Sequence, residues 1–186
     1  MMKIPEAIVP DESARSKVES LSGERIAACY QCEKCTNGCP VTFAMDIVPH
    51  KLMRLVHYGA LDPVLRSRTV WACASCETCS TRCPNGIDIT HVMDTLRQLS
   101  LREGSNAQKS TPLFHREFLS SVRRHGRVHE AGMIIGYTLK NEGIPGLLRQ
   151  AGVGLKLLLR GKLKPLPRSH AAGQVKEIFK QAEGEV

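Results

Sequence analysis

The sequence has no cysteine outside two short segments, and this absence excludes several kinds of chemistry. All eight cysteines lie between residues 29 and 83. None is left over as a nucleophile, as a separate redox-active pair or as a ligand to a third metal centre. We therefore predict no catalytic residue, and we expect the chain to carry electrons or metal rather than to transform a substrate.

Aromatic residues are also scarce, at 4% of the 186 residues. A large core filled with aromatic side chains is not expected, and the length suits one domain with an appended arm. No secretory signal is evident. The most apolar stretch, residues 144–163, is broken by lysine and arginine and is too short to span a bilayer. We expect a cytoplasmic protein that is not transmembrane, because a reducing compartment keeps such thiols free.

Acidic residues are fewer than basic ones, 18 against 26, and the net charge is +8. The excess lies in residues 105–186, which hold 14 basic and 6 acidic side chains. Such a region can be a solvated face, or it can bind an acidic protein, an anionic membrane or nucleic acid. No aromatic platform for stacking bases is evident, so nucleic acid is not predicted. Peripheral membrane contact through Leu147–Leu163 stays an open alternative, because apolar and basic residues alternate there.

One cysteine motif occurs twice in the sequence. Residues 29–40 and residues 73–84 both read C-x2-C-x2-C-x3-C-P. This is the bacterial ferredoxin pattern for a cysteine-ligated [4Fe-4S] cluster. The two copies predict two [4Fe-4S] clusters.

The proline after each fourth cysteine bears on how the ligands are shared. Proline lacks an N–H and has a fixed φ, so it turns the chain away from the cluster that the first three cysteines hold. In two-cluster ferredoxins the fourth cysteine ligates the other cluster. We predict one cluster held by Cys29, Cys32, Cys35 and Cys83, and a second held by Cys73, Cys76, Cys79 and Cys39.

Structural zinc and disulfides are the alternative uses of these cysteines. Zinc sites usually take cysteines as pairs separated by a longer loop, whereas four cysteines fall within eleven residues here, twice. Cysteines at every third position suit metal ligation better than a disulfide framework. A zinc adaptor that uses the basic region remains a remote alternative. The histidines, including His50, His57 and His91, are expected to be surface or capping residues.

The hydrophobic pattern predicts an almost entirely helical protein. Leu52, Leu55 and Val56 fall at helical spacing and Gly59 can end their helix, while Asp62 and Pro63 can begin the next one. An extended segment is expected at 164–167, and residues 144–163 are expected to be interrupted by proline and glycine. Helices are predicted near residues 13–21, 46–59, 64–71, 87–104, 111–126, 128–140 and 173–182.

The same pattern predicts three parts. Residues 1–25 form a flexible N-terminal lead-in, residues 26–104 form a dicluster ferredoxin domain, and residues 105–186 form a basic helical extension that binds partners. Both cysteine segments are expected in loops between helices.

The span 26–104 resembles the α-helical ferredoxin domain, which is also the C-terminal half of succinate dehydrogenase iron-sulfur subunits. Within that superfamily it is most similar to the small iron-sulfur (C-type) subunits of heterodisulfide reductase and its bacterial relatives. The residues that carry the resemblance are the two cysteine motifs with Pro40 and Pro84, joined by two helices, and Trp71 before Cys73.

This resemblance implies an all-α fold with a helical C-terminal extension. It also implies an electron relay between two larger partners, one that contains flavin and one that is catalytic. The catalytic partner of that family binds its clusters through Cys-Cys-Gly motifs. The present sequence has neither Cys-Cys-Gly nor a flavin fingerprint, so the resemblance places the chemistry in partner chains. A free-standing dicluster ferredoxin, or the iron-sulfur subunit of another oxidoreductase, are the alternatives.

Overall fold

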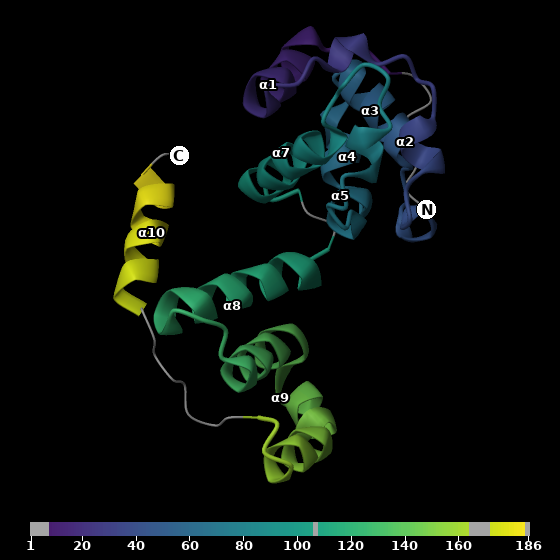
Figure 1. Cartoon of the computed structure of the whole chain (residues 1–186). Helices are drawn as coiled ribbons and strands as arrows, with labels where there is room; N and C mark the ends of the chain where they lie inside the picture. Colours follow the sequence, from purple (N-terminus) through teal and green to yellow (C-terminus); the bar gives the residue numbers. More distant parts are fainter. Residues whose placement is uncertain (1–7, 106–107, 164–171, 185–186) are drawn as a thin grey trace. The chain divides into compact units, whose positions relative to one another are not determined.

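The computed structural model describes residues 8–105, 108–163 and 172–184, and over these ranges the chain is helical without a β-strand (Figure 1). The predicted all-α fold is confirmed. The chain divides into two compact units, Met1–Gln108 and Lys109–Val186. The extended segment predicted at 164–167 lies outside the described residues.

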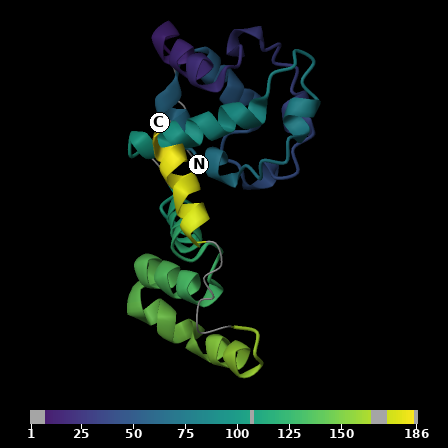
Figure 2. The same ribbon diagram turned by 60° about the vertical axis from the view of Figure 1, so that its left-hand side comes forward.

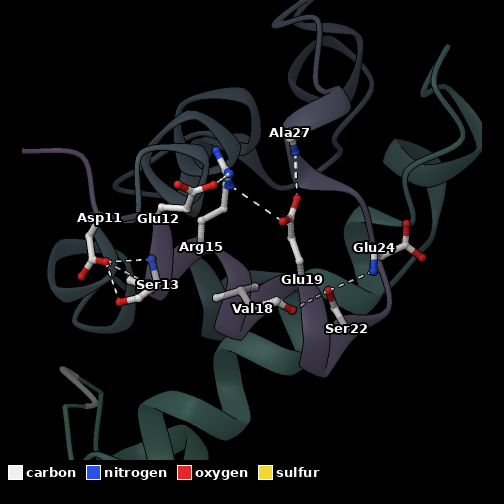
Figure 3. Close-up of polar contacts among 10 residues, drawn as sticks. Asp11, Glu12, Ser13, Arg15, Val18, Glu19, Ser22, Glu24 and Ala27 are labelled. Carbon is white, nitrogen blue, oxygen red and sulfur yellow. Dashed lines mark hydrogen bonds and ion pairs between the residues drawn. The ribbon is translucent and has the colours of Figure 1, made fainter.

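The first helix, α1 (Glu12–Ser22), belongs to the first unit. Asp11 caps it by accepting the backbone N–H groups of Ser13 and Ala14 at 2.9 and 3.1 Å (Figure 3), and Gly23 ends it at φ 69°. Val18 is fully buried in the core of the unit. The residues expected to be a flexible lead-in therefore include a helix that packs against α3 and α7.

Two glutamates fix the chain where it leaves α1. Glu19 accepts the N–H of Ala27 at 2.9 Å, and Glu24 accepts the N–H of Asp88 at 3.0 Å (Figure 3 shows the first). Ala27 lies two residues before the first cysteine, and Asp88 follows the second motif. These bonds attach the start of one cysteine motif and the end of the other to the chain at the end of α1.

Helices α3 (Pro49–His57) and α7 (Ile89–Arg102) form the centre of the first unit. Asp88 caps α7 by accepting the N–H of His91 at 3.0 Å. Figure 2 shows α7 (teal) among the other helices of the unit from a second side. The buried apolar side chains of the two helices are Pro49, Leu52, Met53, Leu55, Val56, Ile89, Val92, Met93, Leu96 and Leu99.

The helix predicted at 64–71 is in fact two short helices, α4 (Leu61–Leu65) and α5 (Thr69–Ala72). The break has a tertiary cause. Asp46 accepts the N–H groups of Arg68 and Thr69 at 2.9 and 3.1 Å and the Thr69 hydroxyl at 2.8 Å. Burial raises the pKa of the Asp46 carboxyl, but these hydrogen bonds outweigh burial and leave its pKa lowered. A new helix therefore starts at Thr69 and leads to Cys73.

The second unit contains α8 (Ser110–His125), α9 (Glu130–Leu159) and α10 (Ala172–Gly184). Helix α9 changes direction at Gly143, whose φ of 70° is left-handed (Figure 1). Beyond the bend the chain is helical again, with Pro145 near the start, where proline is tolerated. The interruption expected within residues 144–163 is therefore wrong for residues 144–159, which are continuous helix, because the break lies before them at Gly143.

An ion pair and an aromatic pair join α8 to α9. Lys140 lies 2.7 Å from Glu117, whose residue is 8% exposed, and the rings of Phe114 and Tyr137 meet edge to face at 5.6 Å. Many large apolar side chains of these helices nevertheless remain exposed. They include Phe118, Leu119, Ile134, Ile135, Leu139, Ile144, Leu148, Val153, Leu155, Leu158 and Leu159. No helix in the described part of the chain has the length and apolarity needed to cross a membrane.

Candidate functional site

Four cysteines line one cavity in the first unit. Cys29 follows the short 3₁₀ helix Ile26–Ala28, Cys35 lies in α2 (Lys34–Asn37), and Cys32 lies between them. Cys83 comes from the second motif and lines the same space. The cavity is partly open to solvent. We call this group the first cysteine site.

The other four cysteines line a second cavity. Cys73 and Cys76 precede α6 (Thr78–Thr81), Cys79 lies within it, and Cys39 comes from the first motif. We call this group the second cysteine site. In both sites three cysteines of one motif are brought together with the fourth cysteine of the other, which is the grouping predicted from the sequence.

Helices α3 and α7 each contribute to both sites. On α3, Pro49 lines the second cavity and Met53 lines the first. On α7, Ile89 lines the first cavity and Met93 lines the second. Four residues of a helix rise about 6 Å. The two cysteine sites are therefore neighbours, about one turn apart along both α3 and α7.

The two cysteine loops repeat the same unusual backbone. Gln31 and Glu33 have φ of 56° and 62°, and Ser75 and Glu77, at the matching positions, have φ of 49° and 60°. These four are the non-glycine residues with positive φ in the described part of the chain. A left-handed residue costs roughly 1–2 kcal/mol unless it is glycine. Alternating right- and left-handed backbone forms concavities lined by N–H groups, which recur at iron-sulfur sites.

The positive φ of Glu33 predicts that a β-branched side chain at this position impairs iron binding. Replacing Glu33 with valine should lower the iron bound per chain and the thermal midpoint of the anaerobically loaded protein, because a β-branched residue tolerates positive φ poorly. Glu33→Gly should retain full iron loading. Lys34→Val is the matched control, since Lys34 is also exposed but starts a helical segment. Equal iron loading of Glu33→Val and Lys34→Val would contradict the role given to the backbone.

The short helices α2 and α6 pack against each other, and this contact explains Gly38. Its φ of −96° needs no glycine. A Cβ there would lie 2.7 Å from Cδ of Arg82, the residue at the matching position of the second motif. Glycine at one copy of the repeat therefore leaves room for the arginine of the other.

Several polar side chains that the sequence pattern did not single out approach the cysteine sulfurs. Gln31 donates its Nε2–H to Cys29 Sγ at 3.2 Å in the first site. In the second site, hydroxyl groups lie 3.5 and 3.7 Å from the sulfurs of Cys76 and Cys79. Those hydroxyls belong to Thr78 and Thr90. The Thr78 hydroxyl lowers the pKa of the Cys76 thiol.

Burial acts in the opposite direction on the inner cysteines. It raises the pKa of the Cys35 thiol to about 11, and it also raises the pKa of Cys73. These thiols stay protonated near neutral pH unless a metal takes the place of the proton. Sets of four cysteines around a cavity, with partly buried sulfurs and donors beside them, fit a thiolate-ligated iron-sulfur cluster.

His50 lies at the rim of the first site and is held by hydrogen bonds. Its backbone N–H donates to Thr36 Oγ1 at 3.0 Å, and its ring Nδ1 lies 2.8 Å from the same oxygen. The side chain joins α3 to α2, which is a structural role different from the surface or capping role expected for the histidines. Within the described ranges, no three His, Cys, Asp or Glu side chains are grouped as a single metal ion would require.

Comparison with known proteins identifies the cysteine region. Residues 28–88 match the family model of the 4Fe-4S dicluster domain. Iron-sulfur clusters are thus the cofactor of this region.

Proteins of known family resemble a larger part of the chain. The iron-sulfur C2 subunit of CoB–CoM heterodisulfide reductase from Methanocaldococcus jannaschii is 38% identical over 120 residues, which is 64% of this chain and 61% of that relative. Two further relatives are each 35% identical over 83 residues. They are the iron-sulfur C-type subunit of the Methanopyrus kandleri enzyme and the C2 subunit of the H2/formate:CoB-CoM heterodisulfide,ferredoxin reductase of Methanococcus maripaludis.

The similarity covers only part of these proteins. This chain spans less than two thirds of the first relative and under half of the other two, 43% and 45%. The stretch that matches the family model, residues 28–88, contains both cysteine motifs. The chain therefore carries a 4Fe-4S dicluster domain at residues 28–88 and is similar, over part of its length, to C-type iron-sulfur subunits of heterodisulfide reductases.

Proposed function

We propose that this chain is the electron-transfer subunit of a heterodisulfide reductase-like complex and holds two [4Fe-4S] clusters. Cys29, Cys32, Cys35 and Cys83 would hold one, and Cys39, Cys73, Cys76 and Cys79 the other. The observation that supports this best is that each cavity combines three cysteines of one motif with the last cysteine of the other. When bound, such clusters accept and release single electrons.

The neighbouring positions of the two sites support a relay. Both are lined by residues of α3 and α7 that lie four positions apart, about 6 Å along each helix. Each site also has one exposed cysteine, Cys32 in the first and Cys76 in the second. An electron could thus pass between two adjacent sites that each meet the surface at one cysteine.

The residues of this chain hold the sites and shield them. Deprotonated cysteine sulfurs act as ligands, and the donors near them favour the more negative state of a cluster. Apolar side chains cover the inner walls, and burial of this kind limits access of water. They are Met53, Ile87 and Ile89 in the first site, and Val41, Met45 and Met93 in the second.

The proposed partners are two larger chains of a heterodisulfide reductase-like complex, one that contains flavin and a catalytic one with Cys-Cys-Gly motifs. The relatives are named as subunits of heterodisulfide reductases, which supports membership of such a complex. Two aromatic residues are exposed: Tyr30, which lines the first site, at 74%, and Phe43, in the chain between two residues that line the second site, at 87%. Aromatic residues of this kind are enriched in protein interfaces.

Iron and sulfide analysis tests the cofactor assignment. Chain purified or reconstituted without oxygen should contain about eight iron atoms and about eight sulfides, as two [4Fe-4S] clusters require. It should show a visible absorption band at about 400 nm that weakens on reduction with dithionite, whereas bound zinc gives no such band. Stoichiometric zinc without sulfide would overturn the proposal.

A further inference from the structure

The two cysteine loops have matching backbones but are held by different side chains. Ala28 precedes Cys29, and its carbonyl accepts a hydrogen bond from the neutral amide of Asn85. The start of the second loop is held instead by the guanidinium group of Arg97, which reaches it from α7. One loop is thus fixed by a neutral group and the other by a cation.

Arg97 makes three contacts with the second loop and the helix before it. Its Nε–H donates to the carbonyl of Val70 at 2.5 Å, one Nη donates to the carbonyl of Cys73, and the other donates to Ser75 Oγ at 3.0 Å. The Arg97 side chain is only 18% exposed. A guanidinium charge in such a position is screened less by water than a charge at the surface.

Asp94 offsets part of this charge. Its carboxylate lies 2.6 Å from Nη1 of Arg97, but the Asp94 side chain is 47% exposed. Solvent therefore screens the carboxylate more than the guanidinium group. Asp94 therefore compensates only part of the positive charge that Arg97 places beside the second loop.

The reduction potential of an iron-sulfur cluster depends on nearby charge, hydrogen bonds to its sulfurs and solvent exposure. Each site has one exposed cysteine, so exposure does not separate the two sites. Polar side chains lie near the sulfurs in both, Gln31 in the first site and Thr78 and Thr90 in the second, so hydrogen bonding separates them only in number. The guanidinium group bound to the Cys73 carbonyl does separate them. A positive charge favours the reduced state, which carries one more electron.

We propose that Arg97 raises the reduction potential of the second cysteine site, so that this site receives the first electron, and that Asp94 limits the effect. This inference rests on the proposed function, because it needs a cluster at each site. Arg97 is not a ligand, and the proposed effect comes from its charge beside the loop that it holds.

A redox titration followed by electron paramagnetic resonance tests the proposal on the full-length, cluster-loaded protein. In Arg97→Gln the higher of the two midpoint potentials, which the proposal assigns to the second cysteine site, should move to a more negative value while the other stays. In Asp94→Asn the same midpoint should move to a more positive value. Arg102→Gln is the matched control, since Arg102 is an exposed arginine of the same helix, and it should leave both potentials in place.

The outcomes separate an electrostatic role from a structural one. If Arg97→Gln keeps full iron but shifts neither midpoint, or shifts both equally, the proposal is wrong. Where Arg97→Gln loses iron from one site, Asp94→Asn decides, because that variant keeps the guanidinium contacts with the loop. If the midpoint potential in Asp94→Asn stays unchanged or becomes more negative, the proposal is wrong. Wild-type protein that binds fewer than two clusters would refute the proposed function rather than this inference. Iron and sulfide analysis of the wild type detects that outcome separately.

Discussion

The double variant Cys76→Ala/Cys83→Ala is expected to bind almost no iron, whereas Cys32→Ala/Cys83→Ala is expected to keep about four iron atoms per chain. The difference follows from the shared ligation proposed for the two motifs. Cys83 lines the first cavity together with Cys32, and Cys76 lines the second. Removing Cys76 and Cys83 therefore damages both sites, although both residues belong to one motif.

If each motif instead held its own cluster, the two results would be reversed. Cys76→Ala/Cys83→Ala would then lose one cluster and keep about four iron atoms, and Cys32→Ala/Cys83→Ala would lose both. Two further double variants repeat the test with the last cysteine of the first motif. Cys39→Ala/Cys76→Ala should keep about four iron atoms, and Cys32→Ala/Cys39→Ala should bind almost none. Iron, sulfide and protein are measured on the same anaerobic samples, and far-ultraviolet circular dichroism reports whether each variant stays helical.

A chain truncated after residue 108 is expected to keep its iron and to lose its partner chains. The cut falls at the boundary between the two compact units, and all eight cysteines lie before it. The removed unit exposes Leu148 and Leu155 at 70% and 57%, two helical turns apart on α9. Patches of exposed apolar side chains commonly mark interaction sites.

Smaller changes can test the same surface without removing the unit. Full burial of a leucine is worth about 1.5–3 kcal/mol, so Leu148→Ser/Leu155→Ser should weaken partner binding by roughly tenfold or more if both residues are buried in the complex. Val9→Ser is the control, because Val9 is 85% exposed in the first unit. Tagged chains are purified from native extract, and the associated proteins are identified by mass spectrometry and size-exclusion chromatography.

Co-purification of the truncated chain with the same proteins would show that partners bind the first unit instead. A full-length chain that elutes alone as one small species would favour a free-standing ferredoxin. A Cys-Cys-Gly protein and a flavoprotein among the associated chains would support the proposed complex.

Local sequence patterns predicted most helices, but not where one predicted helix breaks. Residues 64–71 read as a single helix because Asp62 and Pro63 make a good local start. The carboxylate that begins α5 belongs to Asp46, 22 residues before Arg68. No pattern within the segment contains that information, since the cap depends on how α3 and α5 are placed in space.

The left-handed residues of the cysteine loops show the same limit. Positive φ is usually inferred from glycine, and none stands at positions 31, 33, 75 or 77. The one local signal is that glutamate follows the second cysteine in both copies of the motif. Arg97 gives no signal at all, because it lies on a helix 24 residues after the Cys73 carbonyl that it binds.

The sequence by itself determined the cofactor class and the helical architecture, because cysteine spacing and apolar periodicity are local properties of the chain. It also predicted which cysteines come together, through the proline after each fourth cysteine. Only the tertiary structure decided that the two sites share α3 and α7 as walls, that α1 packs into the core, and that a guanidinium group holds one cysteine loop. These features depend on contacts between residues far apart in the chain, which become defined only when the helices pack.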